Sequence, residues 1–301
     1  TDIIPLAGEP VEDILAAAAS VESGSEHPLG QAIVAHTKSL GLELSRPEGF
    51  MAVTGGGVTA KVAGKLVLVG TGKLIKEHGI IIDPVVEKNK AELEDQAKTV
   101  MFVAIDGEAI GLIAVADQVK TDSALAIAAL KRFGMVPVMI TGDNERTARA
   151  IAAEVGIDEV IANVMPEDKS NEVKRLQDTG RTIAMVGDGI NDAPALTQAD
   201  VGIAIGTGTD IAIEAGDIVL VRGELSAVVK AIKLSQATFK KIKQNLFWAF
   251  FYNVVMIPLA VIGVLHPVLA EIAMAFSSIN VVTNSRRLQR ADIQMYTEES
   301  R

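Results

Sequence analysis

Three short segments combine a hydroxyl, a lysine and carboxylates in a way that suits phosphoryl chemistry. They are Thr141-Gly142-Asp143, Lys169, and the run Gly187-Asp188-Gly189-Ile190-Asn191-Asp192. A hydroxyl and backbone N–H groups can donate to a phosphoryl group, an ammonium can neutralise it, and carboxylates can hold a bridging Mg²⁺. Any one of these segments alone is more often a turn or a helix cap. Their occurrence at successive strand ends favours a phosphoryl site.

The elements expected to position these segments are buried parallel strands. Four continuous apolar runs are each followed by a loop and a helical segment: VPVMI, VIANV, TIAMV and VGIAI. This alternation is typical of a doubly wound α/β domain with a parallel sheet. Ligands in such domains bind at the carboxyl ends of the strands, which is where the three segments fall.

The first hundred or so residues follow a different pattern, which predicts an α+β unit. Helices are expected over residues 11–20 and after His27-Pro28. Two antiparallel hairpins are expected, 58–63 with 66–69 and 100–105 with 109–116, with turns at Gly64-Lys65 and Asp106-Gly107.

Apolar residues near the carboxyl end predict a membrane hairpin. Residues 245–265 carry no charge and are long enough as a helix to cross a hydrocarbon core of about 30 Å. Residues 268–284 form a shorter apolar stretch, which is expected to cross the membrane back as the second span of the hairpin. Lysines precede the first span and arginines follow the second, so the positive-inside rule places both outer ends in the cytoplasm.

Composition excludes several classes of protein. The 301 residues include no cysteine, so disulfides, thiolate metal clusters and a cysteine nucleophile are ruled out. The net charge of −10 argues against non-specific binding of nucleic acid, which requires neutralisation of phosphates by lysine and arginine.

The motifs TGDN, PEDK and MVGDGINDAPAL resemble the phosphorylation domain of P-type ATPases, which belong to the haloacid dehalogenase superfamily. The resemblance implies that the Thr141-Gly142-Asp143 loop and Lys169 contact the phosphoryl group. It also implies that Asp188 and Asp192 hold Mg²⁺, and that Asn191 and Asp192 close the site.

The sequence departs from that family at one point. Its members are phosphorylated on the aspartate of a DKTGT motif, and no part of residues 1–301 reads DKTGT. We therefore expect a carboxy-terminal portion of a longer transporter, with an incomplete phosphorylation domain that lacks its first strand and is inactive alone.

The amino-terminal unit resembles the nucleotide-binding domain of heavy-metal P-type ATPases. The residues that carry this resemblance are Glu22, Ser25-Glu26-His27-Pro28, Gly55-Gly56-Gly57 and Gly70-Thr71-Gly72. An imidazole can stack on adenine, a carboxylate can accept from its amine, and glycines let the ligand approach the backbone. Taken singly, a histidine such as His27 is more often a helix-start residue, and glycines such as these are more often part of hairpin turns. The resemblance implies an ATP site formed by Glu22, His27, Gly55, Gly57, Gly70 and Gly72.

The apolar stretches resemble the last two spans of Cu(I)-exporting pumps. The shared residues are Tyr252 and Asn253 in the first stretch, and Met274, Ser277 and Ser278 in the second. A thioether suits a soft ion such as Cu(I) or Ag(I). Methionine also fills gaps in helix packing, and serines also allow close helix contact. The family's remaining ion ligands, a Cys-Pro-Cys in an earlier span, are not in this sequence.

These observations predict an α/β protein with four parts: a nucleotide-binding domain over 1–112, a Rossmannoid phosphorylation domain over 113–234, a membrane hairpin over 235–288 and a cytoplasmic tail over 289–301. The predicted function is ATP-driven export of Cu(I), or Ag(I), through an aspartyl phosphate, with ATP and Mg²⁺ as cofactors.

The resemblance implies an integral protein of the cell membrane with its soluble domains in the cytoplasm. Expected partners are the lipid bilayer, the rest of the pump and a copper chaperone. Two alternatives stay open at this point: a membrane-anchored phosphatase of the same superfamily, and a non-catalytic ATP-binding subunit of a split pump.

Overall fold

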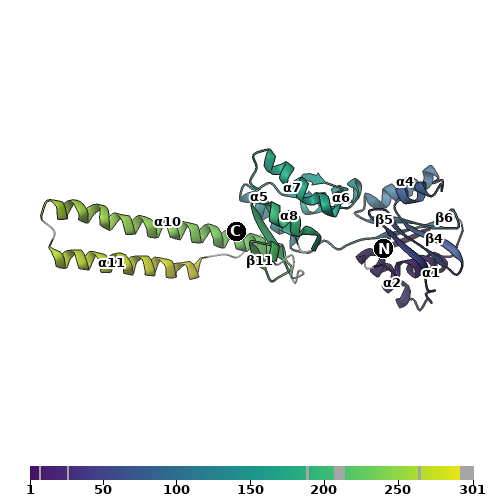
Figure 1. The fold of residues 1–301 in the computed structure, drawn as a ribbon, viewed down its shortest axis with the longest axis horizontal. Helices are drawn as coiled ribbons and strands as arrows, with labels where there is room; N and C mark the ends of the chain where they lie inside the picture. The colour runs from purple at the N-terminus through teal and green to yellow at the C-terminus, as the bar shows by residue number, and fades with distance from the viewer. Residues whose placement is uncertain (7, 26, 188–189, 207–213, 264–265, 292–301) are drawn as a thin grey trace. The chain divides into compact units, whose positions relative to one another are not determined.

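The computed structural model describes residues 1–301 apart from 7, 26, 188–189, 207–213, 264–265 and 292–301 (Figure 1). The chain folds as two compact units. The first contains Thr1–Lys120 and Pro137–Ile183, and the second contains Thr121–Val136 and Ala184–Arg301.

An antiparallel six-stranded sheet dominates the first unit, in the order β1-β6-β5-β4-β3-β2. Its strands are β1 (Asp2–Pro5), β2 (Glu48–Val53), β3 (Gly57–Val62), β4 (Lys65–Gly70), β5 (Thr99–Ile105) and β6 (Glu108–Val115). Helices cover both faces (Figure 1): α1 (Val11–Glu22) and α2 (Pro28–Ser39) on one, α3 (Gly72–Glu77) and α4 (Pro84–Glu94) on the other. The predicted α+β unit is confirmed, and β1 is a strand that the sequence patterns did not predict.

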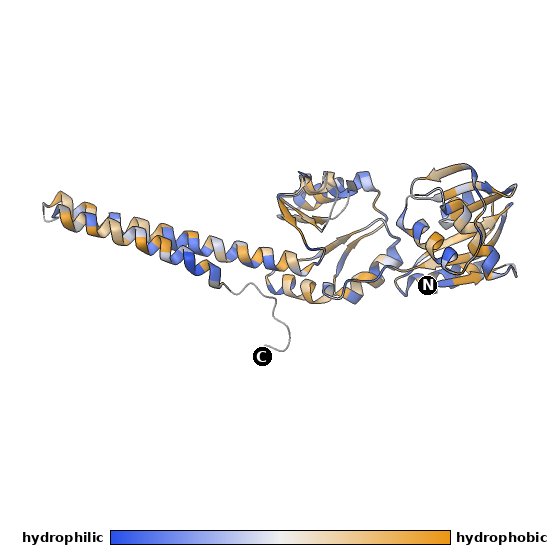
Figure 2. Ribbon diagram, turned by 90° about the horizontal axis from the view of Figure 1, so that it is seen from below, coloured by the Kyte–Doolittle hydropathy of each residue, from blue (hydrophilic) through white to orange (hydrophobic). Residues whose placement is uncertain are grey.

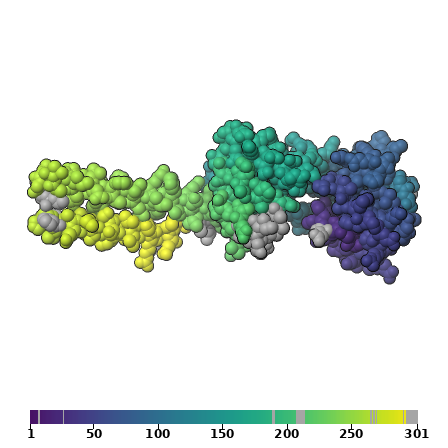
Figure 3. All heavy atoms as spheres, viewed as in Figure 1, coloured from purple at the N-terminus to yellow at the C-terminus, as the bar shows by residue number. Residues whose placement is uncertain are grey.

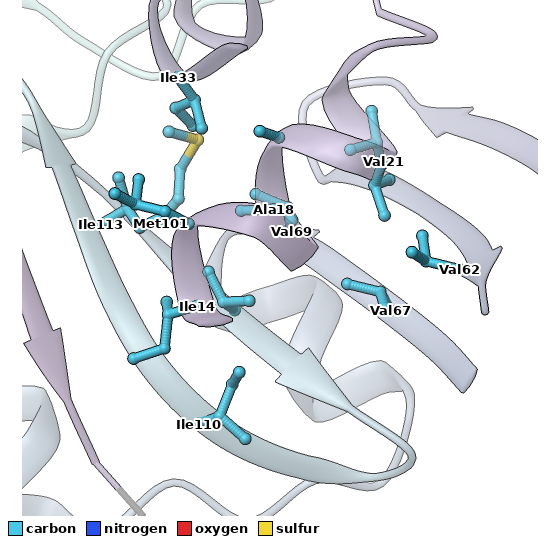
Figure 4. Close-up of a cluster of buried hydrophobic side chains, with 14 of the residues drawn as sticks. Ile14, Ala18, Val21, Ile33, Val62, Val67, Val69, Met101, Ile110 and Ile113 are labelled. Atoms are coloured by element: carbon cyan, nitrogen blue, oxygen red, sulfur yellow. The ribbon is translucent and has the colours of Figure 1, made fainter. Parts of the chain in front are cut away.

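The sheet separates two apolar cores because alternate side chains of a strand point to opposite faces. Met101 and Val103 of β5 pack with Ile14, Ala18 and other residues beneath α1 and α2 (Figure 4). Val100, Phe102 and Ala104 of the same strand pack beneath α3 and α4. Both faces are therefore buried, which fixes the register of every central strand.

Both predicted hairpins form, and each turns on two residues with positive φ. Asp106 and Gly107 have φ of 47° and 90° between β5 and β6. The turn between β3 and β4 uses Ala63 and Gly64, with φ of 50° and 80°, one residue earlier than predicted. Positive φ at both central positions matches the right-handed twist of the strands that they join.

The remainder of the first unit is a parallel pair of short strands with two helices. Strand β7 (Val138–Ile140) pairs with β8 (Glu159–Ile161). Helix α6 (Glu145–Val155) connects them, and β8 is followed by a 3-10 turn η1 (Pro166–Asp168) and by α7 (Lys169–Asp178).

The second unit contains a three-stranded parallel sheet in the order β11-β10-β9. Its elements are α5 (Ser123–Arg132), β9 (Ala184–Gly187), η2 (Ile190–Asp192), α8 (Ala193–Gln198), β10 (Val201–Ile205) and β11 (Ile218–Leu220). Helix α8 packs on β10 through Leu196 and Ala204.

The parallel strands therefore form two sheets, whereas the sequence predicts one doubly wound sheet that lacks its first strand. Among the described strands, β7 bonds to β8 alone and β9 bonds to β10 alone. No described strand bonds to both β7 and β9, so each keeps one edge without a ladder partner in the described part of the chain. A parallel sheet is continuous only where every strand has a bonded neighbour.

Two long helices complete the second unit: α10 (Ser226–Val261) and α11 (Pro267–Arg286), followed by η3 (Arg287–Arg290). They lie side by side as an antiparallel pair (Figures 1 and 3). Helix α10 begins at Ser226, well before the predicted span that starts at residue 245. Helix α5 packs against α10. The backbone N–H of Ser226 donates to Asp122 Oδ2 at 2.7 Å, which anchors its start.

Apolar residues predominate in the outer half of α10 (Figure 2). Among the described helices, α10 alone is both long and apolar enough to cross a membrane, and none of its apolar window is buried within the structure. Helix α11 adopts the predicted helical return over Pro267–Arg286.

Candidate functional site

The predicted glycines meet across one strand pair. Gly57, the first residue of β3, is the Cα partner of Gly70, the last residue of β4. A β-carbon on Gly57 would overlap Val69 O, and one on Gly70 would overlap Gly56 O. The Thr71 N–H donates to Gly56 O at 2.7 Å and closes this end of the hairpin. The Cβ position of each glycine is thus occupied by backbone atoms of the facing strand, so glycine is required here for the close approach of β3 and β4.

The flanking glycines have different local roles. Gly55 has φ of 66° and is exposed in the turn between β2 and β3. Gly72 is the first residue of α3, whose N-cap Thr71 accepts from the Leu74 N–H at 3.4 Å. Its φ is not positive, and a β-carbon there would lie 3.3 Å from the Phe102 ring. The structure therefore requires glycine for backbone reasons at Gly55 and Gly57, and for close approach at Gly70.

Glu22 and His27 lie at the corner between α1 and α2. His27 is the N-cap of α2, and its Nδ1 accepts from the Leu29 N–H at 3.2 Å. The neutral ring therefore carries its proton on Nε2 and is exposed to solvent. The helix-start role of His27 is confirmed, and it leaves Nε2 and the ring face available to a ligand.

Glu22 is the last residue of α1 and is only 5% exposed. Burial raises the pKa of its carboxyl above the ordinary value, and a hydrogen bond from Ser25 offsets part of this rise. A buried carboxyl is costly to ionise unless donors surround it, so Glu22 favours a ligand that brings N–H or O–H donors.

The corner packs on the sheet next to the glycine hairpin. The backbone of Gly24 lies against the Phe50 ring, 3.0 Å from the position of a β-carbon, and Phe50 belongs to β2. Strand β2 pairs with β3. The predicted nucleotide-site residues therefore lie on two adjoining parts of the first unit: the corner between α1 and α2, and the sheet edge that includes β2 and β3.

The loop after β7 holds the predicted phosphate hydroxyl in a small network. Thr141 Oγ1 donates to Asp143 Oδ2 at 2.9 Å and accepts from the Asp143 N–H at 3.1 Å. The Thr141 N–H donates to Ile161 O at 3.0 Å, and Asn163 donates to Asp143 O at 2.8 Å. The loops after β7 and β8 are thus fastened together at the carboxyl edge of the pair.

Gly142 and Lys169 occupy the same edge. A β-carbon on Gly142 would contact Val164 O at 3.4 Å. Lys169 is the first residue of α7, directly after η1, and is half-buried. The parallel pairing of β7 with β8 therefore brings Thr141, Gly142, Asp143 and the start of α7 to one end of the strands.

The end of β9 carries the other predicted group. Asp192 is 8% exposed and lies so close to Gly187 that a β-carbon there would be 2.7 Å from Asp192 Cβ. Asn191 is exposed in η2, and Asp188 lies outside the described residues. No cluster of three or more metal-ligating side chains occurs in the described part of the chain. The donor present, the Asp192 carboxylate in η2 after β9, has the hard oxygen chemistry that Mg²⁺ prefers.

The predicted ion residues are divided between the interface of the two long helices and their outer faces. Tyr252 Oη accepts from Asn280 Nδ2 at 2.8 Å across the helix pair. Ser277 is half-buried, whereas Met274 is 72% exposed and Ser278 is exposed. Asn253 is exposed and donates to Ala249 O of its own helix at 2.8 Å. Within the described hairpin, these five side chains do not converge on one point.

Sequence reasoning missed Asn280 and Gly30. Asn280 lies on the buried stripe of α11 with Ala273, Ser277 and Asn284, and the 4-3-4 spacing of these small and polar residues could have revealed it. A β-carbon on Gly30 of α2 would overlap Glu22 Oε2. Only the packing of α2 against α1 identifies that contact.

The chain is similar in sequence to a known protein family and to known ATPases. The family of haloacid dehalogenase-like hydrolases matches residues 1–200. The copper-exporting P-type ATPase of Bacillus subtilis (strain 168) is 53% identical over 294 residues, which are 96% of this chain and 36% of that protein. The chain thus spans about a third of that relative's length.

Solved structures give the same picture. The crystal structure of a zinc-transporting PIB-type ATPase in the E2.Pi state matches with a TM-score of 0.70 and 37% identity, over 96% of this chain and 46% of that one. The catalytic domain of the CPx-ATPase CopB-B matches with a TM-score of 0.53 and 30% identity, over 73% of this chain and 77% of that one.

Proposed function

Because the chain belongs to the haloacid dehalogenase-like hydrolase family, we propose that it binds ATP and handles its γ-phosphoryl group as part of a P-type ATPase that exports Cu(I). The observation that carries the proposal is the buried carboxyl of Glu22 at the same helix corner as the exposed ring of His27. A desolvated carboxyl acceptor and an exposed imidazole suit an adenine, which offers an exocyclic amine and an aromatic face.

ATP would bind at the corner of α1 and α2 and along the glycine hairpin. The exposed His27 ring would stack on the adenine, and Glu22 would accept from its exocyclic amine. Gly55, Gly57, Gly70 and Gly72 would let the ribose and phosphates approach the backbone. ATP would bring N–H donors to the buried Glu22 carboxyl, in addition to its hydrogen bond with Ser25.

The strand ends supply the groups for phosphoryl transfer. Thr141 and Lys169, on the edge of the β7–β8 pair, would donate to the phosphoryl group and neutralise it. Asp192, with Asp188, would hold Mg²⁺, and Asn191 would close the site. The metal would supply charge neutralisation at the phosphoryl oxygens.

The transported ion is proposed to be Cu(I), with Ag(I) as a chemically similar alternative. The thioether of Met274 would be the soft donor, and Tyr252, Asn253, Ser277 and Ser278 would supply the further oxygen and nitrogen donors of the ion path. The 53% identity to a copper-exporting ATPase supports copper over zinc, whose transporter is 37% identical. The hairpin is proposed to lie in the membrane, with the first unit and the sheet of β9, β10 and β11 in the cytoplasm.

The test is a calorimetric titration of the whole chain with ATP and Mg²⁺. His27→Ala should weaken ATP binding about fivefold, since one stacking contact contributes about 1 kcal/mol. His36→Ala, which changes an exposed histidine on the same helix, is the matched control and should leave affinity unchanged. Equal affinities for the parent and His27→Ala would refute the assignment.

A second measurement separates the alternatives. The chain should bind labelled ATP without forming an acid-stable, hydroxylamine-labile phosphoenzyme, because none of its 301 residues belongs to a DKTGT motif. Hydrolysis of a simple phosphomonoester would instead favour the membrane-anchored phosphatase. Copper chemistry is tested by competition with a chromogenic Cu(I) chelator, in which Met274→Leu should lower the bound Cu(I).

A further inference from the structure

One stripe of α10 is basic and aromatic, and the proposed transport cycle does not use it. Phe239, Lys240, Lys243, Phe247 and Trp248 line an open groove of about 520 Å³ on this helix. Phe239, Lys243 and Phe247 follow one another at intervals of four residues, and Lys240 and Trp248 are eight residues apart, so the five side chains share one helix face. Lys243 Nζ lies 4.6 Å from the centroid of the Phe239 ring.

The groove has a basic end and an apolar end. Lys240 and Lys243 lie where the helix enters its apolar half, and Phe247 and Trp248 lie one to two turns further along. The adjacent Lys241 bonds to Gln244 and to Asn284 of α11, at 3.2 and 3.0 Å, so it is held by the helix pair. Lys240 and Lys243 are exposed on α10.

The charge of this region is opposite to that of the whole chain. Helix α10 contains no acidic residue, and the one acidic residue of α11 is Glu271, in the half of α11 nearer its start at Pro267. Arg286 and Arg287 end α11 close to the same level as Lys241 and Asn245, as the bond from Asn245 to Ser285 shows. A protein of net charge −10 thus concentrates positive charge at the base of its apolar hairpin.

We propose that this groove is a binding site for one anionic phospholipid of the membrane leaflet that faces the base of the hairpin. The lipid phosphate would bind Lys240 and Lys243, and an acyl chain would lie on Phe247 and Trp248. A single lipid molecule joins an anionic group to a hydrocarbon chain and so matches both ends of the groove. If a protein helix occupied the groove instead, it would need acidic side chains of its own to pair with Lys240 and Lys243.

The inference rests on the proposed membrane location of the hairpin. Trp248 is the sole tryptophan of the chain and lines the groove, so its fluorescence reports the groove directly. It lies about 12 Å along the helix from Lys240, which places it at the depth of acyl-chain carbons when the phosphate is at the lysines.

The experiment reconstitutes the whole chain in nanodiscs of phosphatidylcholine and phosphatidylglycerol in equal amounts. Bromine is placed on the acyl chains of one lipid or of the other, and quenching of Trp248 is compared. Each lysine contributes about a fivefold preference for anionic lipid, so brominated phosphatidylglycerol should quench as if enriched at least about fivefold near Trp248. Equal quenching by the two lipids would overturn the proposal.

Matched variants locate the effect. Lys240→Gln with Lys243→Gln should abolish the enrichment while both lipids still quench. Lys230→Gln with Lys233→Gln removes the same charge from the same helix outside the groove and should keep the enrichment. Equal loss in both double variants would mean that only the general charge of the helix attracts lipid, which would overturn a specific site.

One further variant separates failure of this site from failure of the membrane location. In Trp248→Phe with Val255→Trp, the reporter moves into the exposed apolar half of α10. If this reporter is quenched while Trp248 is not, the hairpin lies in the bilayer but protein covers the groove, and the lipid site is refuted. If neither is quenched, the membrane location itself is refuted.

Discussion

Gly57 and Gly70 face each other across the β3–β4 ladder, and neither position has space for a β-carbon. Gly57 also has φ of 139°, a conformation that other residues rarely adopt. This pair brings two separate glycine motifs of the sequence to one place. It lets the backbones of β3 and β4 approach closely at the end of the hairpin where the Thr71 N–H bonds to Gly56 O.

Gly57→Ala should destabilise the first unit by about 1–3 kcal/mol, because the new methyl group overlaps Val69 O and the backbone is strained. Thermal unfolding of the chain in detergent measures this, and ATP affinity should fall with it. Gly64→Ala is the matched control in the same hairpin: φ is 80°, but no atom lies within 4 Å of the added carbon, so the cost should be about 1 kcal/mol. A larger loss for Gly64→Ala would contradict the steric explanation.

Gly30→Ala should weaken ATP binding through Glu22, because the added methyl group would displace the buried carboxyl. Titration of the single variants and of Gly30→Ala with Glu22→Ala forms a double-mutant cycle. Once Glu22 is alanine, the change at residue 30 should have no further effect on affinity. Additive losses would show that Gly30 acts independently of Glu22.

The raised pKa of Glu22 predicts a pH dependence of stability. The ordinary pKa is 4.5, and burial raises it in the folded state. The contribution of Glu22 to stability is therefore fully present below pH 4.5 and is lost as the pH rises through the folded pKa, because the charged form is then buried.

Thermal midpoints between pH 4 and pH 7 test this dependence. Glu22→Gln should gain stability relative to the parent chain as the pH rises. Glu12→Gln, which alters an exposed carboxyl at the other end of α1, should show no such trend. A Glu22→Gln curve parallel to that of the parent would contradict the burial argument.

Tyr252→Phe should weaken the helix pair by about 0.5–2 kcal/mol, because it removes the acceptor for Asn280 Nδ2. Unfolding in mixed micelles measures the loss, and the effect should vanish in an Asn280→Ala background. Asn253→Ala serves as the comparison, since Asn253 bonds to Ala249 O of its own helix and should not couple to Asn280.

The sequence by itself determined the elements whose local chemistry is unambiguous. Asp106-Gly107 specifies a tight hairpin turn, His27-Pro28 specifies a helix start, and the uncharged run after Asn245 specifies a long apolar helix. Each of these signals acts within a few residues of its own position. The motifs TGDN and GDGINDAPAL likewise identified the family before any contact was known.

Only the tertiary structure decided which of these residues meet. The opposition of Gly57 to Gly70 depends on the β3–β4 register, and the contact of Gly30 with Glu22 depends on how α2 packs on α1. The division of the described parallel strands into two sheets and the exposure of Met274 are likewise visible only in the tertiary structure. Hydrophobic periodicity specifies which face of an element is buried, but the neighbour that covers it is selected by the whole fold.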